Sequence, residues 1–432
     1  MNFYNLKHKE EQLNFKEATI KGQGKDKGLF FPEDISKFSN EFLQNLPNLS
    51  NEEIAFQVMK DFAGDEIPEA ELRKIVSETI AFEIPLKKVT ENISVLELFH
   101  GPTLAFKDVG ARFMSRCLGY FLKNETRKVT VLVATSGDTG GAVANGFYDV
   151  EGIEVVILYP KNRVSPVQEK QLTALGKNIH ALEVNGSFDD CQALVKQAFS
   201  DESLTEKLLL TSANSINVAR WLPQQIYYVL ALKQWLKIHS ENPVICVPSG
   251  NFGNICAGIL AHHRGLPVEH FIAACNVNDV VPEYLRTEIL QPKETVATIS
   301  NAMDVGDPSN FVRILELFDK EFNQVKNKLS GYTIDDEETL KTIERVEKDY
   351  GYVLDPHGAV AFVALEKYLA ENGGKGFFLE TAHPVKFPDS VEQATGKSVE
   401  IPKSLEELMR QEKFTTEINP QYEELKEFLL KK

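Results

Sequence analysis

Short apolar runs alternate with helical segments over most of this chain, and that alternation is compatible with only a few classes of fold. Residues 129–134 (VTVLVA) form a near-continuous apolar run, 155–159 (VVILY) form a second, and 181–184 form a weaker third. Apolar residues recur at helical spacing over 140–148 and 189–199. Strands that are apolar on both faces are typical of a buried parallel sheet, and short strand–helix connections imply right-handed crossovers. The pattern therefore predicts an α/β protein with a doubly wound sheet.

Further strands of the same kind extend this core. Residues 93–99, 244–247 and 377–379 are each expected to form one. A chain of 432 residues is too long for one simple core, so we expect more than one domain. The strand–helix units together predict an α/β core over residues 93–400.

The two ends of the chain have a different pattern. Residues 1–92 are predicted to be mainly helical, because apolar residues recur at helical spacing over 52–62 and 69–82. Residues 401–432 are rich in Lys and Glu and are predicted to form a helical extension. The charged stretch 335–348 is expected to be the solvent-exposed face of a helix.

Composition excludes several classes of partner. The formal net charge of −16, from 47 Lys and Arg against 63 Asp and Glu, argues against a nucleic-acid surface or an anionic membrane. No apolar run approaches the ~20 residues needed to span a bilayer. The five cysteines form no C-x-x-C pair, and their odd number and wide spacing favour a reducing compartment. We therefore expect a cytoplasmic protein that binds neither nucleic acid nor membrane, with a local basic pocket for any anionic substrate.

No metal site is expected. His262 and His263 are adjacent and therefore do not share a helix face. No cluster of His, Cys and Asp has the spacing of a structural zinc site.

One lysine stands out for its surroundings. Residues 100–108 (HGPTLAFKD) begin with a turn signal and continue with a short apolar run that ends at Lys107. A lysine held against apolar surface has its charged form disfavoured, so its pKa falls and it can act as a neutral amine. Such an amine can form a Schiff base and shuttle protons. A lone lysine after Phe more often buries its stem and keeps its ammonium group in water, so this stretch alone leaves both interpretations open.

Three polar loops follow predicted strands, at residues 135–141 (TSGDTGG), 249–254 (SGNFGN) and 381–387 (TAHPVKF). Ligands gather outside the carboxyl ends of the strands in an open parallel sheet, so we expect all three loops at one edge of the core. The first loop offers small hydroxyl groups and free N–H groups at a helix start, which suit a carboxylate. A turn that only caps the helix is the alternative.

The second loop is predicted to hold a phosphate. Its two glycines allow close approach of the backbone, and N–H groups at a helix start can bind the anion. It is neither a Walker loop, since Gly-Lys-Ser/Thr is absent, nor a G-x-G-x-x-G dinucleotide fingerprint. An ordinary Gly/Asn turn is the alternative.

The 100–108 motif resembles the lysine motif of threonine synthases, which are pyridoxal 5′-phosphate (PLP) enzymes of the tryptophan-synthase-β fold group. Residues 1–6, 28–32 and 301–311 (NAMDVGDPSNF) are also similar to segments of that family, so the resemblance covers nearly the whole chain. It implies an α/β protein of PLP fold type II. Two doubly wound lobes would hold the cofactor at their interface, beside a mainly helical N-terminal region.

The resemblance also implies a role for individual residues. Lys107 would carry PLP and act as the catalytic base, and Thr381 would face the pyridine nitrogen. The PLP phosphate would be bound by the second loop, at Ser249, Gly250, Asn251, Phe252, Gly253 and Asn254. The α-carboxylate of the substrate would be bound by the first loop, at Thr135, Ser136, Asp138 and Thr139. His383 is expected to be structural.

A further segment, residues 214–220 (NSINVAR), is similar to a phosphate-contacting segment of the family. It implies that Asn214 and Arg220 bind the phosphate of the substrate, in keeping with the preference of phosphate for Arg. Val218 stands where the family pattern has proline. Lys161 and Arg163 are weaker candidates for the same anion.

The function implied by the resemblance is conversion of O-phospho-L-homoserine and water to L-threonine and phosphate, the final step of threonine biosynthesis. A serine/threonine dehydratase of the same fold group is one alternative, although its substrate carries no phosphate to occupy the Arg220 segment. A non-catalytic binding protein that keeps the fold is another. We expect a monomer or a weak homo-oligomer.

Overall fold

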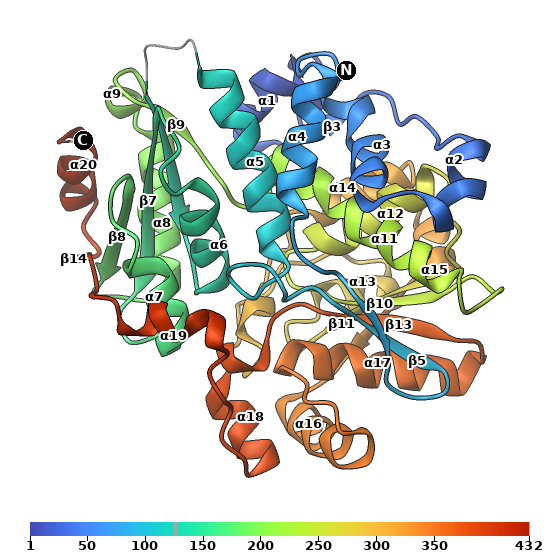
Figure 1. Ribbon diagram of the computed structural model, residues 1–432. Helices are drawn as coiled ribbons and strands as arrows, with labels where there is room; N and C mark the ends of the chain where they lie inside the picture. Colours follow the sequence, from blue (N-terminus) through green and yellow to red (C-terminus); the bar gives the residue numbers. More distant parts are fainter. Residues whose placement is uncertain (124–127, 432) are drawn as a thin grey trace.

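The computed structural model describes residues 1–123 and 128–431. Two mainly parallel sheets form two lobes that lie side by side, with the N-terminal elements against one of them (Figure 1). The α/β architecture predicted from the alternation of strands and helices is therefore confirmed.

The larger lobe is built on a six-stranded sheet in the order β12-β11-β10-β13-β5-β4. Every neighbouring pair is parallel except β4 and β5. Its strands, which include the three predicted at 93–99, 244–247 and 377–379, are β4 Leu86–Lys88, β5 Ile93–Glu97, β10 Val244–Pro248, β11 His270–Cys275, β12 Leu329–Thr333 and β13 Gly376–Glu380.

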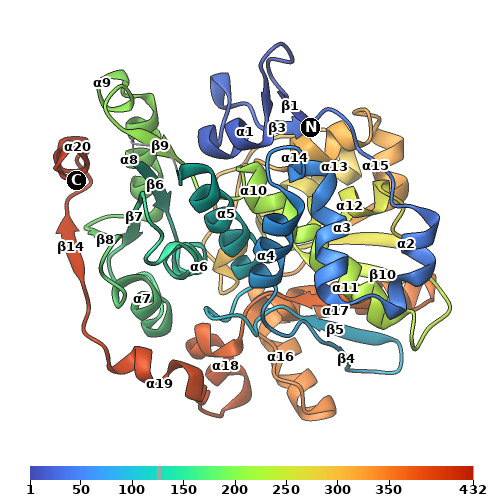
Figure 2. The ribbon, with the colours of Figure 1, turned by 45° about the horizontal axis from the view of Figure 1, so that its top comes forward.

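The smaller lobe is built on a five-stranded, wholly parallel sheet in the order β14-β8-β7-β6-β9. Its strands are β6 Val129–Ala134, β7 Ile153–Pro160, β8 Ile179–Val184, β9 Leu209–Thr211 and β14 Thr415–Ile418. The edge strand β14 lies within residues 401–432, which were predicted to form a helical extension, so that prediction missed this strand. The C-terminal chain runs past α7 to reach this edge (Figure 2).

Both faces of each sheet are covered, because alternate residues of one strand enter different cores. On β6, Leu132 belongs to the buried cluster that includes residues of α8 and α20, whereas Val131 and Val133 belong to the main core, which includes residues of α5 and α6. On β10, Cys246 packs with residues of α17, whereas Val247 belongs to the main core. This arrangement explains why the strands read as unbroken apolar runs.

The helices connect the strands as the sequence pattern predicts. Helix α5 Lys107–Leu122 packs against α6 of the smaller lobe and against α4 and α10. The helices of the larger lobe are α10 Val218–Trp221, α11 Gln225–Trp235, α12 Gly253–His263, α13 Val280–Thr287, α14 Phe311–Leu317, α15 Phe322–Lys328, α16 Asp336–Tyr350, α17 Pro356–Asn372 and α18 Pro388–Thr395. Those of the smaller lobe are α6 Asp138–Phe147, α7 Pro166–Thr173, α8 Phe188–Ser200, α9 Glu202–Thr205, α19 Lys403–Arg410 and α20 Tyr422–Leu430. No helix in the described residues is long and apolar enough to cross a membrane.

The N-terminal region contains the predicted helices and a small sheet that the sequence pattern missed. Its helices are α1 Phe15–Lys21, α2 Asn40–Asn45, α3 Asn51–Ala63 and α4 Glu69–Thr79. Its strands, β1 Asn2–Asn5, β2 Gln12–Asn14 and β3 Phe30–Pro32, pair antiparallel in the order β2-β1-β3. Strands of three or four residues are too short to show an alternating pattern.

Candidate active site

The three polar loops meet, but from two different sheets. The 249–254 loop follows β10 and the 381–387 loop follows β13, and these strands are parallel neighbours in the larger lobe. The 135–141 loop follows β6 in the smaller lobe. Lys386, after β13, forms an ion pair of 2.7 Å with Asp138, after β6. The expectation of one shared sheet edge is therefore wrong, because the loops come together from the facing edges of two lobes.

The lysine loop is joined to the loop after β13 by main-chain contacts. Ala105 and Ala382 form an isolated antiparallel bridge. The Phe106 N–H donates to the Thr381 carbonyl at 2.9 Å, and the His383 N–H donates to the Leu104 carbonyl at 3.0 Å. These contacts place Lys107, the first residue of α5, next to the segment that contains Thr381.

Lys107 has an unpaired amine, which agrees with the less common of the two interpretations that its local sequence left open. Within the described chain its Nζ has no hydrogen-bond or ion-pair partner, and it lies 5.5 Å from the centroid of the Phe106 ring. Desolvation lowers the Lys107 pKa, as do the nearby charges of Lys386 and Arg220, whereas Asp138 acts in the opposite direction. An amine of this kind is suited to covalent chemistry with a carbonyl group.

The 249–254 loop presents a row of free donors. In the part of the chain that the structure describes, the backbone N–H groups of residues 250–254 donate to no protein acceptor. A Cβ added at Gly250 would lie 2.6 Å from the Met303 Cα, and Phe252 has a left-handed φ of 62°. The Asn254 amide closes the loop by donating to the Pro248 carbonyl at 2.8 Å. Free N–H groups at the start of α12 fit the phosphate of a cofactor.

Other side chains of this loop are used within the protein. The buried Ser249 hydroxyl donates to the Val247 carbonyl at 2.8 Å. Asn251 donates from its amide to the Ser215 hydroxyl at 2.8 Å and accepts at its side-chain oxygen from the Ser309 N–H at 2.7 Å. The loop therefore has main-chain donors for a ligand while its side chains set its shape.

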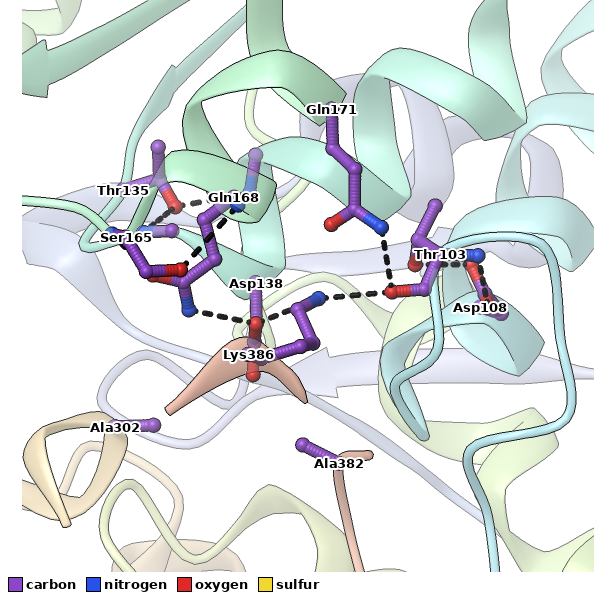
Figure 3. Close-up of polar contacts among 12 residues, drawn as sticks. Thr103, Asp108, Thr135, Asp138, Ser165, Gln168, Gln171, Ala302, Ala382 and Lys386 are labelled. Carbon is purple, nitrogen blue, oxygen red and sulfur yellow. Dashed lines mark hydrogen bonds and ion pairs between the residues drawn. The ribbon is translucent and has the colours of Figure 1, made fainter. Parts of the chain in front are cut away.

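The 135–141 loop divides into residues that shape it and residues that stay open. The Thr135 hydroxyl accepts from the N–H groups of Gly137 and Gly140, at 3.0 and 2.9 Å. Asp138 is buried and bonded to Lys386 and Gln168 (Figure 3). Ser136 and Thr139 are half-buried and make no side-chain hydrogen bond within the described residues. These two hydroxyls are free to contact a ligand.

Arg220 is a buried cation without an acidic partner. Its Nη1 donates to the Ala213 carbonyl, its Nε has no partner, and no carboxylate of the described residues pairs with it. Desolvation lowers the Arg220 pKa to about 10. Asn214, in the same segment, is half-buried and its side-chain amide has no bond within the described chain. A buried guanidinium with a free donor favours an anionic ligand.

The weaker candidates lie in other surroundings. Lys161 pairs with Glu417 at 2.8 Å, and Arg163 is exposed.

The third loop contributes one free hydroxyl and one structural histidine. Thr381 is buried, and its hydroxyl has no hydrogen-bond partner in the described residues. The His383 Nδ1 accepts from the Val385 N–H at 3.1 Å, and burial lowers the His383 pKa to about 4. No cluster of three or more His, Cys, Asp or Glu side chains in the described chain is arranged to hold a metal.

Several residues near these loops were missed by sequence reasoning. Asn310 donates from its side chain to the Asn251 carbonyl at 3.0 Å and to the Ser215 hydroxyl at 3.1 Å. The buried Arg313 donates to the Ser215 and Ile216 carbonyls, which fixes the segment before Arg220. Asn310 lies in the 301–311 signature, which was a usable signal, whereas Arg313, Gln168 and Lys386 had none that assigned a role.

Comparison with known families gives three matches along the chain. Residues 2–80 match the family described as "Threonine synthase N terminus", and residues 358–429 match "Threonine synthase, C-terminal". Residues 81–377 match "Pyridoxal-phosphate dependent enzyme".

Two relatives are similar over almost all of the chain. The threonine synthase of Haemophilus influenzae is 46% identical over 431 residues, covering 100% of both chains. That of Escherichia coli is 47% identical over 407 residues, covering 94% of both.

Solved structures agree. The crystal structure of threonine synthase from E. coli superposes with a TM-score of 0.93 at 45% identity over 100% of both chains. The PLP-bound threonine synthase from Brucella melitensis superposes with a TM-score of 0.93 at 35% identity, over 99% of this chain and 98% of that one. A threonine deaminase from Solanum lycopersicum is similar with a TM-score of 0.57 at 15% identity, which shows the fold alone.

Proposed function

The chain belongs to the threonine synthase family of PLP-dependent enzymes, and we propose that its substrate is O-phospho-L-homoserine, converted with water to L-threonine and phosphate. This choice of substrate rests on the environment of Arg220. Its guanidinium is buried, lacks an acidic partner and has a free Nε, and its charge contributes to lowering the Lys107 pKa. A phosphorylated substrate supplies the anion that this arrangement lacks.

The residues of the chain fit the cofactor. The free N–H groups of residues 250–254 support binding of the PLP phosphate, and the backbone of Gly250 leaves no room for a side chain. The partnerless hydroxyl of Thr381 supports a contact with the pyridine nitrogen. When bound, PLP supplies an electron sink for the carbons of the substrate.

The residues around the cofactor divide the remaining work. Lys107 carries PLP and, when its amine is free and neutral, takes the α-proton and later returns it. Ser136 and Thr139 bind the α-carboxylate with the N–H groups at the start of α6. Removal of a proton from the β-carbon lets the γ-phosphate leave while Asn214 and Arg220 hold it. The γ-carbon then gains a proton, and water adds its hydroxyl group at the β-carbon, which leaves one proton for the released phosphate.

A dehydratase of the same fold group is the second candidate. The similarity to a threonine deaminase supports the shared fold only. The buried, unpaired Arg220 favours a phosphorylated substrate over it.

The test is phosphate release from purified protein given O-phosphohomoserine, with threonine identified in parallel and the visible PLP band recorded. Phosphate and threonine in equal amounts are expected. A PLP band with ketoacid formed from serine or threonine, and no reaction of the phosphorylated substrate, would support the dehydratase instead. Absence of a PLP band would contradict both enzymes.

The location, assembly and domain division stay predictions. We propose a cytoplasmic protein, supported by five cysteines that are all buried as free thiols. A monomer or weak homo-oligomer is to be tested by sedimentation. The proposed division is into residues 1–92, 93–400 and 401–432, with the cofactor between the two lobes.

A further inference from the structure

Lys386 is a fully buried lysine between the two lobes, with no role in the reaction as described above. It ends the short 3₁₀ helix Pro384–Lys386, and none of its side chain is exposed. Its ammonium group pairs with Asp138 at 2.7 Å and donates to the Thr103 carbonyl at 2.8 Å (Figure 3). A buried ammonium needs such partners, and these two belong to the two loops that flank Lys107.

Both partners of Lys386 are held from a second side by one helix. From α7, Gln168 donates to Asp138 at 2.9 Å, and Gln171 donates to the Thr103 carbonyl at 3.0 Å. Thr103 in turn donates from its N–H and hydroxyl to the buried Asp108 at 2.9 and 2.6 Å. The ammonium group of Lys386 therefore joins the start of α6 to the lysine loop through a continuous network.

One carboxylate oxygen of Asp138 has no partner in the described chain, and the negative charge of this residue acts on Lys107. The bonds from Lys386 and Gln168 both reach Oδ1, and Oδ2 has no partner among the described residues. Asp138 lies close enough to raise the Lys107 pKa, whereas the charge of Lys386 lowers it. The carboxylate and the ammonium thus act on Lys107 with opposite signs and compensate each other.

The other charged groups around this pair are few. The groups that face Lys107 are Asp138, Lys386 and Arg220, and those that face Lys386 are Asp138, Asp108 and His383. Burial lowers the His383 pKa to about 4, so this histidine does not titrate near neutral pH.

We propose that Lys386 is a positioning residue of the active site: it clamps Asp138 to the Thr103 carbonyl and cancels the Asp138 charge beside Lys107. The clamp fixes the carboxylate-binding loop of one lobe against the lysine loop of the other. The charge compensation keeps the Lys107 nitrogen from being held in its protonated form. This role rests on the proposed function of Lys107 as the residue that carries PLP.

The test titrates the visible absorbance band of bound PLP with pH in the holoenzyme, without substrate. The pH midpoint of the band reports protonation of the nitrogen that joins Lys107 to the cofactor. In Lys386→Met, the uncompensated Asp138 is expected to raise the midpoint by about one pH unit or more. In Asp138→Asn, the unpaired ammonium is expected to lower it. The double variant is expected to return close to the wild type.

Midpoint shifts of opposite sign in Lys386→Met and Asp138→Asn distinguish charge compensation from structural damage. Structural damage would shift the midpoints of both variants in the same direction or leave both unchanged. Lys386→Arg is expected to restore the wild-type midpoint in part. Lys328→Met is the matched control, because Lys328 also donates to main-chain carbonyls, Val268 and Glu269, at the far ends of the parallel strands. Its midpoint is expected to equal that of the wild type.

An unchanged midpoint in a folded, PLP-bearing Lys386→Met protein would overturn the proposal. So would a double variant that stays shifted like Lys386→Met. If Lys386→Met does not fold, the midpoint of Asp138→Asn tests the proposal. A midpoint that is not lowered in that variant contradicts it. Because no substrate is used, failure to make threonine in the wild type would contradict the proposed function and leave this result intact.

Discussion

Buried and half-buried charges in this protein mostly have polar partners, and two of the exceptions, Lys107 and the Nε of Arg220, belong to the proposed site. Arg264 pairs with Asp61 at 2.6 Å. Arg313 has no carboxylate partner, but main-chain carbonyls and Asn310 accept from all three of its guanidinium nitrogens. Arg220 keeps an unpartnered Nε, and Lys107 has no polar partner in the described chain. Groups left unpaired at a cost to stability are expected where a ligand completes them.

Replacing Lys107 with Ala is expected to reduce turnover by about 10³-fold or more, because the proton carrier and the covalent anchor of PLP are lost together. Phosphate release and the visible PLP band measure the change. Lys123→Ala, a surface lysine just beyond the same helix, is the control and should retain both. Substantial phosphate release by Lys107→Ala would show that the assignment is wrong.

Replacing Arg220 with Met is expected to lower kcat/KM for the phosphorylated substrate by about 10²-fold or more, since a buried charged contact to phosphate is lost. Its free energy of unfolding should change little or increase, because an unpaired buried cation is removed. Arg313→Met is the matched control and should lose about 3 kcal/mol or more in denaturant unfolding. Equal loss of stability in the two variants would contradict a binding role for Arg220.

At the scale of elements, the site consists of loops that follow different strands and are bonded to one another. The lysine loop is bridged to the loop after β13, and the Gly-rich loop after β10 is bonded to the 214–220 and 301–311 segments. Just before the free N–H groups at the start of α12, Gly250 lies directly against the backbone of Ala302 and Met303. Small changes at this close contact should therefore lower PLP affinity more than they lower the stability of the fold.

Gly250→Ala tests the close approach of Gly250 to the backbone of Ala302 and Met303. The added Cβ would lie 2.6 Å from the Met303 Cα and 3.0 Å from the Ala302 carbonyl, so the loop must move. We expect PLP affinity to fall by about tenfold or more, as measured by absorbance titration, from the loss of two or three aligned N–H donors.

Gly351→Ala is the matched control for this substitution. Gly351 has a φ of +68° at the end of α16 and no atom within 4 Å of an added Cβ. The change should cost about 1 kcal/mol of stability from backbone strain and leave PLP affinity unchanged. Equal PLP affinity in Gly250→Ala and the wild type would refute the close-approach argument.

At the scale of the whole molecule, the smaller lobe depends on the end of the chain. Strand β14 pairs with β8, and α20 buries Leu425 and Leu429 in the core that includes Leu182 and Leu194. The C-terminal segment is therefore a structural part of that lobe.

Leu425→Ala is expected to lower the free energy of unfolding by about 2–4 kcal/mol, because it leaves a cavity in this core. Leu430→Ala, at an exposed position on the same helix, should stay within about 0.5 kcal/mol of the wild type. Denaturant unfolding of both variants measures the difference. Similar effects of the two changes would mean that α20 does not pack as described.

The pH dependence of stability is a second property of the whole molecule, and His263 allows one contribution to be isolated. Desolvation lowers the His263 pKa to about 4, and its Nε2 is buried without a partner in the described chain. Between about pH 4 and 6.5 the unfolded chain therefore binds a proton that the folded chain does not. The contribution to stability is complete above this window and is lost as pH falls through it.

His263→Phe removes this titration and keeps the aromatic contact with Phe318. Relative to the variant, the wild type should lose about 1–2 kcal/mol of unfolding free energy between pH 7 and pH 5. Denaturant unfolding at the two pH values measures it. A constant difference between the two proteins would show that His263 titrates normally in the folded state.

Much of this structure follows from local patterns. The apolar runs predict six strands of the two lobes, β5, β6, β7, β8, β10 and β13, to within two or three residues, because a strand buried on both faces needs apolar residues in succession. The loops after those strands could be located for the same reason. The other five strands, β4, β9, β11, β12 and β14, were not predicted. The apolar run before Lys107 left two interpretations of this lysine open, and it was the resemblance of the 100–108 and 301–311 motifs that pointed to the family that the comparisons confirm.

Other features depend on partners that are distant in the chain. Lys386 lies 283 residues from Thr103, and the pairing of β14 with β8 joins the C-terminal segment to the middle of the chain. No local pattern distinguishes a lysine that will be buried against a carboxylate from one that stays in water. Neighbours along the chain were therefore enough to predict six of the strands, the loops that follow three of them and the motif that contains Lys107. The tertiary structure alone decided which loops face each other and how their charges compensate, because those interactions depend on packing between lobes.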